Sequence, residues 1–462
     1  MFMLVLSAGA ACSKANPNRC CVDEADCTAN DIPQGSTCSD GLVCRGNQCI
    51  AEVCTTTAEC DPAAPYCASG GLCSSTCDDN SQCPGFGQDA SDKICSNRTC
   101  LQCVAASDCP TQQPVCDNNS CRACAMDSEC ASGACADDGS CVDTSAVIYI
   151  DAAQGLDAGR CTQSAPCKSL QFAVSSALPT RSHIVMAPGL YVGSTQINSM
   201  VTQAPVVTVH GHGASIESAA GSDNNAITVD DVAATLEDLD FPGGDAMFAT
   251  SIVSLTAPCN VYRVTIEDTG GIGAGANMTI EDVTITNTNV GDAIDVGLGS
   301  HLSLDRGVIN AGQNGGLVAT NGGVVAITNL LVFGTIGPGI DLAAATGSVA
   351  FTTVADTGLG GSTPRAFDCS AGLSVTSSII WTPLGPPIGG GCSLNSDIAG
   401  PTPVLGTTNQ DPMFVDEAHR NYHISASSPA KDQVDTGPAN DFEGDPRPQG
   451  ARYDIGADEA PP

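Results

Sequence analysis

Apolar and polar residues alternate in seven short stretches between residues 234 and 380, and these stretches return about every 24 residues. Each reads apolar–x–apolar–x–x–apolar–x–apolar, which is the alternation of a strand with one buried face, broken by a mostly polar corner. The copies are Ala234–Phe241, Cys259–Ile266, Met278–Ile285, Leu302–Ile309, Val325–Val332, Val349–Asp356 and Leu373–Ile380. A fixed repeat of this length predicts coils that stack on one another and bury their apolar faces against their neighbours.

A second short strand precedes each of these stretches, so each coil is expected to contain three strands. The preceding strands are 227–229, 253–255, 272–274, 294–296, 317–319, 340–342 and 367–369. The pattern therefore predicts an all-β chain folded as a parallel β-helix, with Val264, Val283 and Leu330 in one inward column.

The β-helix is expected to span residues 147–400, and a short amphipathic helix near 168–178 is expected to cover its first coil. Apolar residues recur there at the spacing of one helical face, and Pro179 ends the helix. Such a cap would hide the open strand edge of the first coil. Cys161 and Cys167 are expected to close the preceding loop with a disulfide.

Residues 20–142 are a cysteine-rich region that divides into five modules. The modules begin at Cys21, Cys54, Cys77, Cys103 and Cys124. Modules this short cannot build a sufficient core, so we expect disulfides to hold a largely irregular chain together, although spacing does not fix the pairing. A structural zinc site is the alternative, but the region lacks histidine and has no paired CxxC motifs within one module.

An acidic residue precedes the second cysteine in four of these modules. The four are Asp26, Glu59, Asp108 and Glu129. They are interpreted either as a solvated acidic face or as weak calcium ligands.

Composition narrows the range of partners. The 462 residues include 28 cysteines and carry a formal net charge of −35. So negative a chain repels phosphate backbones and anionic lipid surfaces, which argues against nucleic-acid binding and favours cation binding. The cysteines indicate an oxidising compartment.

Residues 1–12 resemble an export signal, with an apolar run from Phe2 to Leu6 followed by small residues. Residues 9–12 are also similar to a bacterial lipobox, which predicts that Cys12 is lipidated. Plain secretion with cleavage near Ala10 or Ala11 is the alternative. We expect an extracellular or outer-surface location, with the membrane contacted only through this lipid.

Two regions resemble known families. Tyr149–Asp151, Ser164–Ala173 and Met186–Tyr191 resemble the opening of right-handed parallel β-helix proteins of the pectin-lyase-like superfamily. Within the tail, 401–462, the segments Asp441–Gly450 and Tyr453–Glu459 are similar to the C-terminal signature of the choice-of-anchor Q group. The latter resemblance implies a bacterial surface protein with a variable means of attachment, for which Cys12 is the expected anchor.

The superfamily includes pectate lyases and polygalacturonases, so the resemblance implies that enzymatic motifs could occur in this chain. His210–Gly213 is similar to the GHG element of polygalacturonases, but it lacks the acidic motif before it and the Arg-x-Lys after it. His210 and His212 are therefore predicted to be turn residues.

Acidic residues recur among the outward positions of the leading strands. These positions are Thr228, Ser254, Gly273, Asp295, Val318, Asp341 and Asp368. At a coil spacing of about 4.8 Å, Asp341 would lie roughly 5 Å from Asp368 and roughly 10 Å from Asp295. The short separation suits a calcium site or a retaining pair of carboxylates, and the long one an inverting pair.

The corner between the two strand halves predicts a ladder of alternating charge. Stacking the corner residues gives Asp238, Arg263, Asp282, Arg306, Asn329, Thr353 and Ser377. Because the first four alternate in sign, each is expected to meet an opposite charge about 4.8 Å above or below it.

Two cysteine predictions follow from the same stacking. Cys369 and Cys392 are one coil apart and are expected to form a disulfide. Cys259 has no such partner and is expected to be a buried free thiol.

Two functions remain open. The first is a non-catalytic surface, adhesion, glycan-binding or cation-binding module. The second is a polysaccharide-active enzyme, a lyase or a glycoside hydrolase, that uses Asp295, Asp341 and Asp368 as catalytic residues. Calcium, bound at Asp341 and Asp368, is the one cofactor that the sequence suggests. Polysaccharides or surface proteins are the expected partners.

Overall fold

The computed structural model describes residues 42–45, 48–51, 66–67, 73–74, 77, 79–80, 83, 94–218, 225–243, 251–268, 270–288, 290–310, 315–319, 322–360, 365–382 and 385–461. The chain forms two compact units, one of residues 1–130 with 135–141 and one of residues 131–134 with 142–462. The predicted signal and its Cys12 lie outside the described residues. Among the residues that are described, no helix is both long enough and apolar enough for a membrane span.

The first unit contains the cysteine-rich modules, and their closing cysteines lie on short antiparallel hairpins. The hairpins are β1 (Leu42–Arg45) with β2 (Gln48–Ala51), β3 (Tyr66–Cys67) with β4 (Cys73–Ser74), β5 (Ile94–Ser96) with β6 (Thr99–Leu101), and β7 (Val115–Asp117) with β8 (Ser120–Arg122). The 3₁₀ turns η3 (Ala106–Asp108) and η4 (Asp127–Glu129) precede the second cysteine of their modules. In the β5–β6 hairpin, Asn97 and Arg98 both take positive φ angles, as a two-residue type I′ turn requires.

The disulfides of the last three modules follow one rule, which the spacing alone did not reveal. The pairs are Cys77–Cys95, Cys83–Cys100, Cys103–Cys116, Cys109–Cys121, Cys124–Cys135 and Cys130–Cys141. In each module the first cysteine bonds the third and the second bonds the fourth. Each module is therefore closed by two crossing links of its own.

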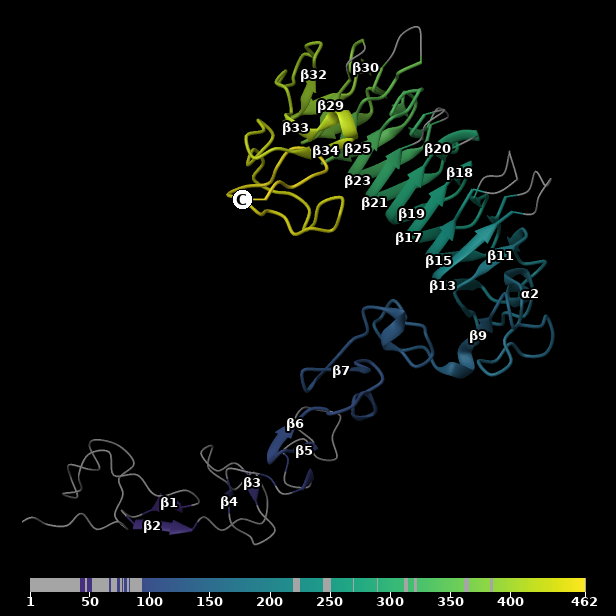
Figure 1. The fold of residues 1–462 in the computed structure, drawn as a ribbon, viewed down its shortest axis with the longest axis vertical. Coiled ribbons are helices and arrows are strands. Elements are labelled where there is room, and N and C mark those ends of the chain that lie inside the picture. The colour runs from purple at the N-terminus through teal and green to yellow at the C-terminus, as the bar shows by residue number, and fades with distance from the viewer. Residues whose placement is uncertain are drawn as a thin grey trace, which may run out of the picture. The chain divides into compact units, whose positions relative to one another are not determined.

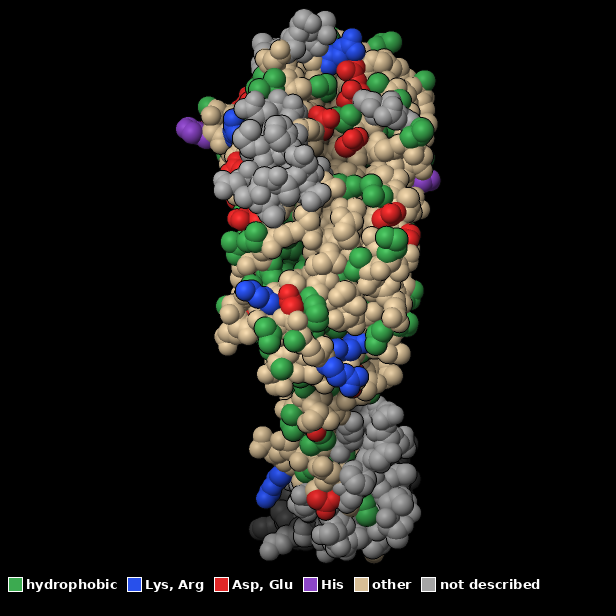
Figure 2. Space-filling view, turned by 90° about the vertical axis from the view of Figure 1, so that its right-hand side faces the viewer, with side chains coloured by type: hydrophobic (Ala, Val, Ile, Leu, Met, Phe, Trp, Pro, Cys, Tyr) green, Lys and Arg blue, Asp and Glu red, His purple; other side chains and the backbone are tan. Residues whose placement is uncertain are grey.

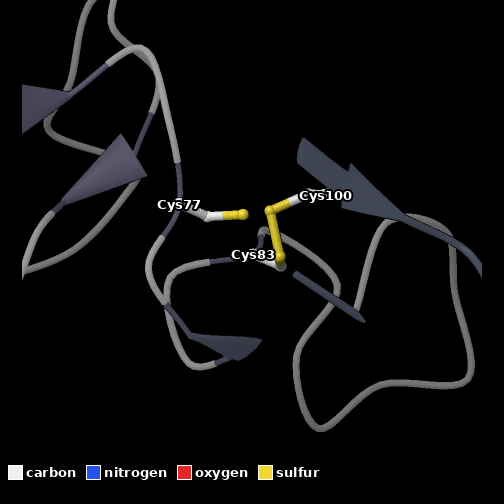
Figure 3. A group of neighbouring side chains, drawn as sticks. All are labelled: Cys77, Cys83 and Cys100. Carbon is white, nitrogen blue, oxygen red and sulfur yellow. A yellow bond between two sulfur atoms is a disulfide. The ribbon is translucent and has the colours of Figure 1, made fainter. Parts of the chain in front are cut away.

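These pairings decide between the disulfide and zinc interpretations for the described modules. The sulfur atoms of Cys77, Cys83 and Cys100 lie within 4.8 Å of one another, close enough for a metal site. Figure 3 shows that Cys83 and Cys100 are joined to each other and not to Cys77. Cys77 is bonded instead to Cys95, which the figure does not draw, with an S–S distance of 2.06 Å. Because all of these sulfurs are in disulfides, no thiolate among them remains to bind zinc.

The acidic residue before the second cysteine has a structural role in two modules. The Asp108 carboxylate accepts hydrogen bonds from the backbone N–H groups of Val104 and Ala105, at 2.9 and 2.8 Å. Glu129 accepts one from the N–H of Ala125 at 2.8 Å. These residues fix the loop between the first two cysteines and are not merely a solvated face. The equivalent residues of the first two modules lie outside the described residues.

The second unit is a parallel β-helix, in which strands from successive coils lie side by side (Figure 1). Its nine-stranded sheet consists of β12 (Thr195–Ile197), β14 (Ile227–Val229), β16 (Ile252–Ser254), β18 (Gly270–Ala274), β20 (Val290–Val296), β22 (Leu317–Val318), β24 (Ile340–Leu342), β27 (Phe367–Cys369) and β30 (Ile388–Gly390). All neighbours in this sheet are parallel.

A second sheet has fifteen strands. Along its main path lie β9 (Val147–Ile150), β10 (His183–Met186), β13 (Val206–Glu217), β15 (Ala233–Phe241), β17 (Cys259–Glu267), β19 (Met278–Thr286), β21 (His301–Asn310), β23 (Val324–Phe333), β25 (Thr346–Ala350), β28 (Leu373–Thr376) and β31 (Ser393–Asn395). The others are β11 (Leu190–Val192), β26 (Thr353–Ala355), β29 (Ile379–Trp381) and β32 (Ile398–Gly400).

A left-handed backbone residue bends this second sheet at the corner of each coil. Positive φ angles of 47–59° occur at His212, Asp238, Arg263, Asp282, Arg306, Asn329, Phe351, Ser377 and Ser396. The bend divides each coil's long strand into two halves, which together with the strand of the nine-stranded sheet make three per coil. The parallel β-helix of about 24 residues per coil predicted from the sequence is thereby confirmed.

The core is formed by columns of apolar side chains that run from coil to coil. Val264 is the register partner of Val283, and Gly307 connects Val283 to Leu330. The three apolar side chains are at most 1% exposed, so the predicted inward column is confirmed. Cys259 is also fully buried and unpaired, as predicted, and burial raises the pKa of its thiol to about 12.

Two of the strands were placed wrongly from the sequence. The strand predicted as 253–255 is β16, Ile252–Ser254, because Ile252 is fully buried whereas Leu255 is 47% exposed. Ser254 therefore points inward, and Val253 takes its predicted place on the outer face.

The second error concerns the sixth repeat. Val349, not Phe351, is the register partner of Ile327 in the core column. Phe351 instead takes the left-handed corner position, φ 47°, and Thr353 begins the next strand, so Thr353 does not belong to the corner ladder.

The first coil is capped in two ways. Helix α2 (Leu170–Ser175) begins at Ser169, whose hydroxyl accepts a hydrogen bond from the N–H of Phe172. The outer edge of β9 is covered by the 161–167 loop, because Tyr149 exchanges backbone hydrogen bonds with Cys161 and Cys167. Those two cysteines form the expected disulfide, with a Cα–Cα distance of 4.8 Å. The 3₁₀ turn η5 (Thr144–Ala146) precedes β9.

The tail runs along the outside of the later coils (Figure 1). It contains β33 (Phe414–Asp416), the turn η6 (Glu417–His419) and β34 (Asn421–Ile424). The N–H of Ala457 donates to the Thr353 hydroxyl at 2.9 Å, and that of Gly456 donates to the Ser377 carbonyl at 2.9 Å. The tail is therefore a lateral cover for the second sheet.

Cys369 and Cys392, on neighbouring coils, form the other expected disulfide, with a Cα–Cα distance of 5.5 Å.

Candidate functional site

The outer face of the nine-stranded sheet presents one residue per coil in a continuous column. In chain order the register partners are Thr228, Val253, Gly273, Asp295, Val318, Asp341, Asp368 and Gly389. Asp341 and Asp368 are direct Cα partners on neighbouring strands, so the structure brings these two together. Asp295 and Asp341 are two coils apart, with Val318 between them. On the face shown in Figure 2, acidic side chains gather toward the end that carries the later coils.

Asp292 joins this face, although the strand pattern did not indicate it. The register between β18 and β20 shifts between Gly270 and Ile272, which creates a bulge on β20 where Asp292 lies. Its carboxylate accepts a hydrogen bond from the N–H of Gly315 at 2.8 Å. A Cβ at residue 315 would lie 2.7 Å from that oxygen, so a larger residue there would displace the carboxylate.

The electrostatics of Asp292 connect it with the predicted residues. Burial raises its pKa above the ordinary value, and the negative charges of Asp295 and Asp341 raise it further. The hydrogen bond from Gly315 opposes these effects without cancelling them. Asp292, Asp295 and Asp341 therefore form one acidic cluster, which we call the acidic face.

Asp368 is set apart from this cluster by an ion pair. Arg365 Nη1 donates to Asp368 Oδ1 at 2.7 Å, and a Cβ at the neighbouring Gly389 would lie only 2.0 Å from that oxygen. Arg365 lies three residues before Asp368 in the sequence. Since its guanidinium group is already paired, it is poorly placed to stabilise the negatively charged intermediate of a lyase.

The acidic face is open and has no ion-pair partner among the described residues. Three hollows occur elsewhere on the second unit: beside α2, beside the corner ladder, and over β17 to β23. None of these three is lined by Asp292, Asp295 or Asp341. Carboxylates on an open strand face can hold a cation or contact an extended polymer.

The two histidines of the 210–213 segment differ from each other. His212 lies at the corner with a φ of 50°, in keeping with the prediction of a turn residue. His210 was predicted wrongly, because it lies within β13 and is fully buried. Its Nδ1 lies 2.5 Å from Glu237 Oε1, and its Nε2 lies 3.1 Å from Nδ1 of His183. Sequence alternation could not reveal this polar chain, since it crosses three coils.

The corner ladder consists of two separate groups of ion pairs. Arg263 binds both carboxylate oxygens of Asp238, at 2.7 and 2.9 Å, and Arg306 binds both oxygens of Asp282, at 2.6 and 3.0 Å. Each arginine thus reaches back to the preceding coil. Each of these four charges therefore meets an opposite charge on a neighbouring coil, as predicted, although among the described residues no ion pair joins Arg263 to Asp282.

Comparisons with known proteins add little beyond the fold. No protein-family model matches the chain, and no curated protein matches it. Among solved structures, the crystal structure of pectate lyase Pel9A is similar at 12% sequence identity and a TM-score of 0.40. The alignment covers 68% of this chain and 96% of that one. Likeness of this degree carries no conclusion about activity or family.

Proposed function

We propose that this chain is an exported, non-catalytic β-helix module that binds divalent cations, and acidic glycans through them, at the acidic face. The observation that carries the proposal is the gathering of Asp292, Asp295 and Asp341 on an open sheet. Carboxylate oxygens are the preferred ligands of calcium, and a bound cation would relieve the repulsion that raises the pKa of Asp292. An open strand face also suits an extended polymer better than a small molecule.

Export to the cell surface fits the disulfides of the first unit, which require an oxidising compartment. Lipidation of Cys12 and membership of the choice-of-anchor Q group belong to this proposal. Mass spectrometry of the exported protein tests the anchor directly, since acylation adds a diacylglycerol mass to the peptide that begins at Cys12. An unmodified N-terminal peptide that begins at Ala11 or Cys12 would favour plain secretion.

A glycoside hydrolase is the second candidate, favoured by one observation. A general acid needs a carboxyl group with a raised pKa, and Asp292 has one. Asp295 and Asp341, two coils and thus roughly 10 Å apart, approach the separation of an inverting pair, about 6.5–9.5 Å. The paired state of Arg365 argues against the lyase alternative.

Calcium titration of the full chain by calorimetry, with and without polygalacturonate, tests the proposal. We expect calcium-dependent retention of the polymer, and at least tenfold weaker calcium binding in Asp341→Asn and Asp295→Asn, because each removes a ligand charge. Glu267→Gln, an exposed acid on the other sheet, is the matched control and should bind as the parent does.

The same samples distinguish the two candidates. Absence of new reducing ends and unsaturated products supports the binding module, provided that calcium binding is found. Release of reducing ends that disappears in Asp292→Asn would establish the hydrolase instead. If the chain neither binds calcium nor releases products, both candidate functions are overturned.

A further inference from the structure

A hollow of about 690 Å³ lies between the corner ladder and the tail, within the second unit. Its floor is the outer face of β19 and β21, at Thr284 and Val308. One wall is the ladder around Arg263, Asp282 and Arg306, and the other is the tail loop, residues 440–444. We call it the ladder hollow.

The ladder hollow exists because the tail covers only part of the sheet. One outward column reads Asp240, Thr265, Thr284, Val308, Leu331, Thr353, Ile379 and Ile398 along the coils. Its first four members are half-exposed and its last four are buried under the tail. The column thus changes from polar to apolar where the cover begins, and the edge of the cover forms a step.

An aromatic ring stands at this step. Phe442 packs on one side against the apolar cluster of Leu331, Tyr422 and Ala457, and its other side lines the hollow. The ring also contacts His423, with centroids 5.6 Å apart. The loop is fixed by the N–H of Phe442, which donates to the Ala457 carbonyl at 3.1 Å. A half-exposed ring on a fixed loop offers a stacking surface at little entropic cost.

The opposite wall offers planar hydrogen-bonding groups in fixed positions. Both guanidinium groups are held by bidentate contacts with the preceding coil, as described above. Among the described residues, Nη1 of Arg263 makes no hydrogen bond, and half of that side chain is exposed. The carboxylates of Glu281 and Asp282 are about 40% exposed and retain acceptor sites.

The ladder hollow is lined by charges of both signs. Two arginines face the carboxylates of Glu281, Asp282 and Glu443, and both arginines are also bonded to carboxylates outside the lining, Glu237, Asp238 and Asp305. Unlike the acidic face, the hollow therefore offers positive as well as negative side chains. An aromatic platform opposite fixed donors and acceptors matches the chemistry of an uncharged polyhydroxyl ligand.

We infer that the ladder hollow is a second binding site, which takes one or two residues of a neutral polysaccharide. A sugar ring stacks on Phe442, and its hydroxyl groups bond to Arg263 and Asp282. The neighbouring coils repeat their side chains about every 4.8 Å, close to the advance of one sugar residue, so the chain can continue over Thr265. This site needs no calcium and goes beyond the function proposed for the acidic face.

Affinity electrophoresis of the full chain in gels that contain galactomannan, xyloglucan or mixed-linkage β-glucan, with chelator present, tests the inference. We expect at least one polymer to retard the parent. Phe442→Leu keeps the apolar packing but removes the ring, and should weaken binding about tenfold. Phe442→Tyr keeps an aromatic ring and should bind the polymer as the parent does. Thermal unfolding checks that each variant is folded.

The controls separate this site from the acidic face. Asp341→Asn should leave retardation by the neutral polymers unchanged, and so should added calcium. The inference is overturned if none of the three polymers retards the parent, or if Phe442→Leu is retarded as strongly as the parent. Loss of retardation in Asp341→Asn would show that the neutral polymers bind at the acidic face, which would also overturn the inference.

Discussion

Asp397 shows how a single buried carboxyl group couples the fold to pH. The side chain is 1% exposed, and its two oxygens accept hydrogen bonds from the N–H groups of Ser378 and Asn395. Burial raises its pKa to about 7, because the two hydrogen bonds do not compensate for the lost hydration. In the unfolded chain the same group has a pKa of about 3.9.

The sign of the pH dependence follows from this difference. Between about pH 4 and pH 7, Asp397 holds a proton in the folded state that it has lost in the unfolded state. The contribution of this carboxyl group to the free energy of unfolding is therefore complete below about pH 4 and is lost as the pH rises through about 7. At about 1.4 kcal/mol per pKa unit, the contribution of Asp397 to the free energy of unfolding falls by up to about 4 kcal/mol. Urea unfolding at pH 4, 5.5, 7 and 8 measures it.

Asp397→Asn is the control for this prediction, because its amide cannot lose a proton. The variant should show a shallower decline of stability with rising pH than the parent. Other groups with a raised pKa, such as Asp454 at about 6, are present in both proteins and cancel in the comparison. Parallel pH profiles would contradict the prediction.

At the residue scale, the sequence predicted what depends only on the coil repeat. The adjacency of Asp341 to Asp368 and the buried thiol of Cys259 are of this kind. Asp292 was missed because a bulge carries it to the acidic face, and bulges leave no mark on a period of two. The pairing of Arg365 with Asp368 depends on side-chain conformation, which no spacing encodes.

At the element scale, each coil turns on one residue in the left-handed region, a conformation that costs most residues about 1–2 kcal/mol. Asp and Asn tolerate it best, and several corners use them. The arginine corners offset the cost with bidentate ion pairs to the corner below. Phe351 is the one apolar residue among the corners of the described coils, and the guanidinium group of Arg447 from the tail lies 5.3 Å from its ring centroid.

The two arginines of the ladder should contribute unequally to stability. Arg306 is 17% exposed and contacts Asp282, Asp305 and Glu281, whereas Arg263 is 50% exposed. We expect Arg306→Ala to lower the free energy of unfolding by about 1–3 kcal/mol and Arg263→Ala by about 0.2–1 kcal/mol. Urea denaturation measures both. Equal losses, or a larger loss for Arg263→Ala, would show that burial does not strengthen these pairs.

The element boundaries failed where apolar residues point outward. Phe351 was assigned to the core because alternation treats every apolar residue as inward, yet this ring is covered by the tail. The one-residue shift at β16 has the same origin, since Leu255 is apolar but exposed. The number and length of coils were nevertheless predictable, because they depend on the repeat and not on any one residue.

At the scale of the whole molecule, the tail explains why one sheet face is apolar in its later coils only. Its signature residues Asp441, Arg447, Asp454, Asp458 and Glu459 are all at least 92% buried. Arg447 donates to the carbonyl of Gly456, while Glu459 accepts from the N–H groups of Gln449 and Asp454. These charged residues hold the cover together.

The sequence identified this tail by resemblance but could not say what it covers. Buried charged residues are rare and costly, so composition suggests an exposed segment. Only the three-dimensional arrangement shows that each of these charged residues hydrogen-bonds to backbone groups and that the cover stops at Val308. The acidic face and the ladder hollow thus occupy different sheets of one β-helix and can be tested separately.

Both proposed sites rest on consecutive coils that stack in the observed register. Ser303 and Ala326 are exposed partners on neighbouring strands, and Ser348 follows one coil later. Mild oxidation of Ser303→Cys/Ala326→Cys, followed by peptide mapping, should reveal a new disulfide, because about 4.8 Å separates the two backbones. Ser303→Cys/Ser348→Cys, at about twice that distance, should remain reduced. Cross-linking of the second pair, or of neither, would contradict the stacking.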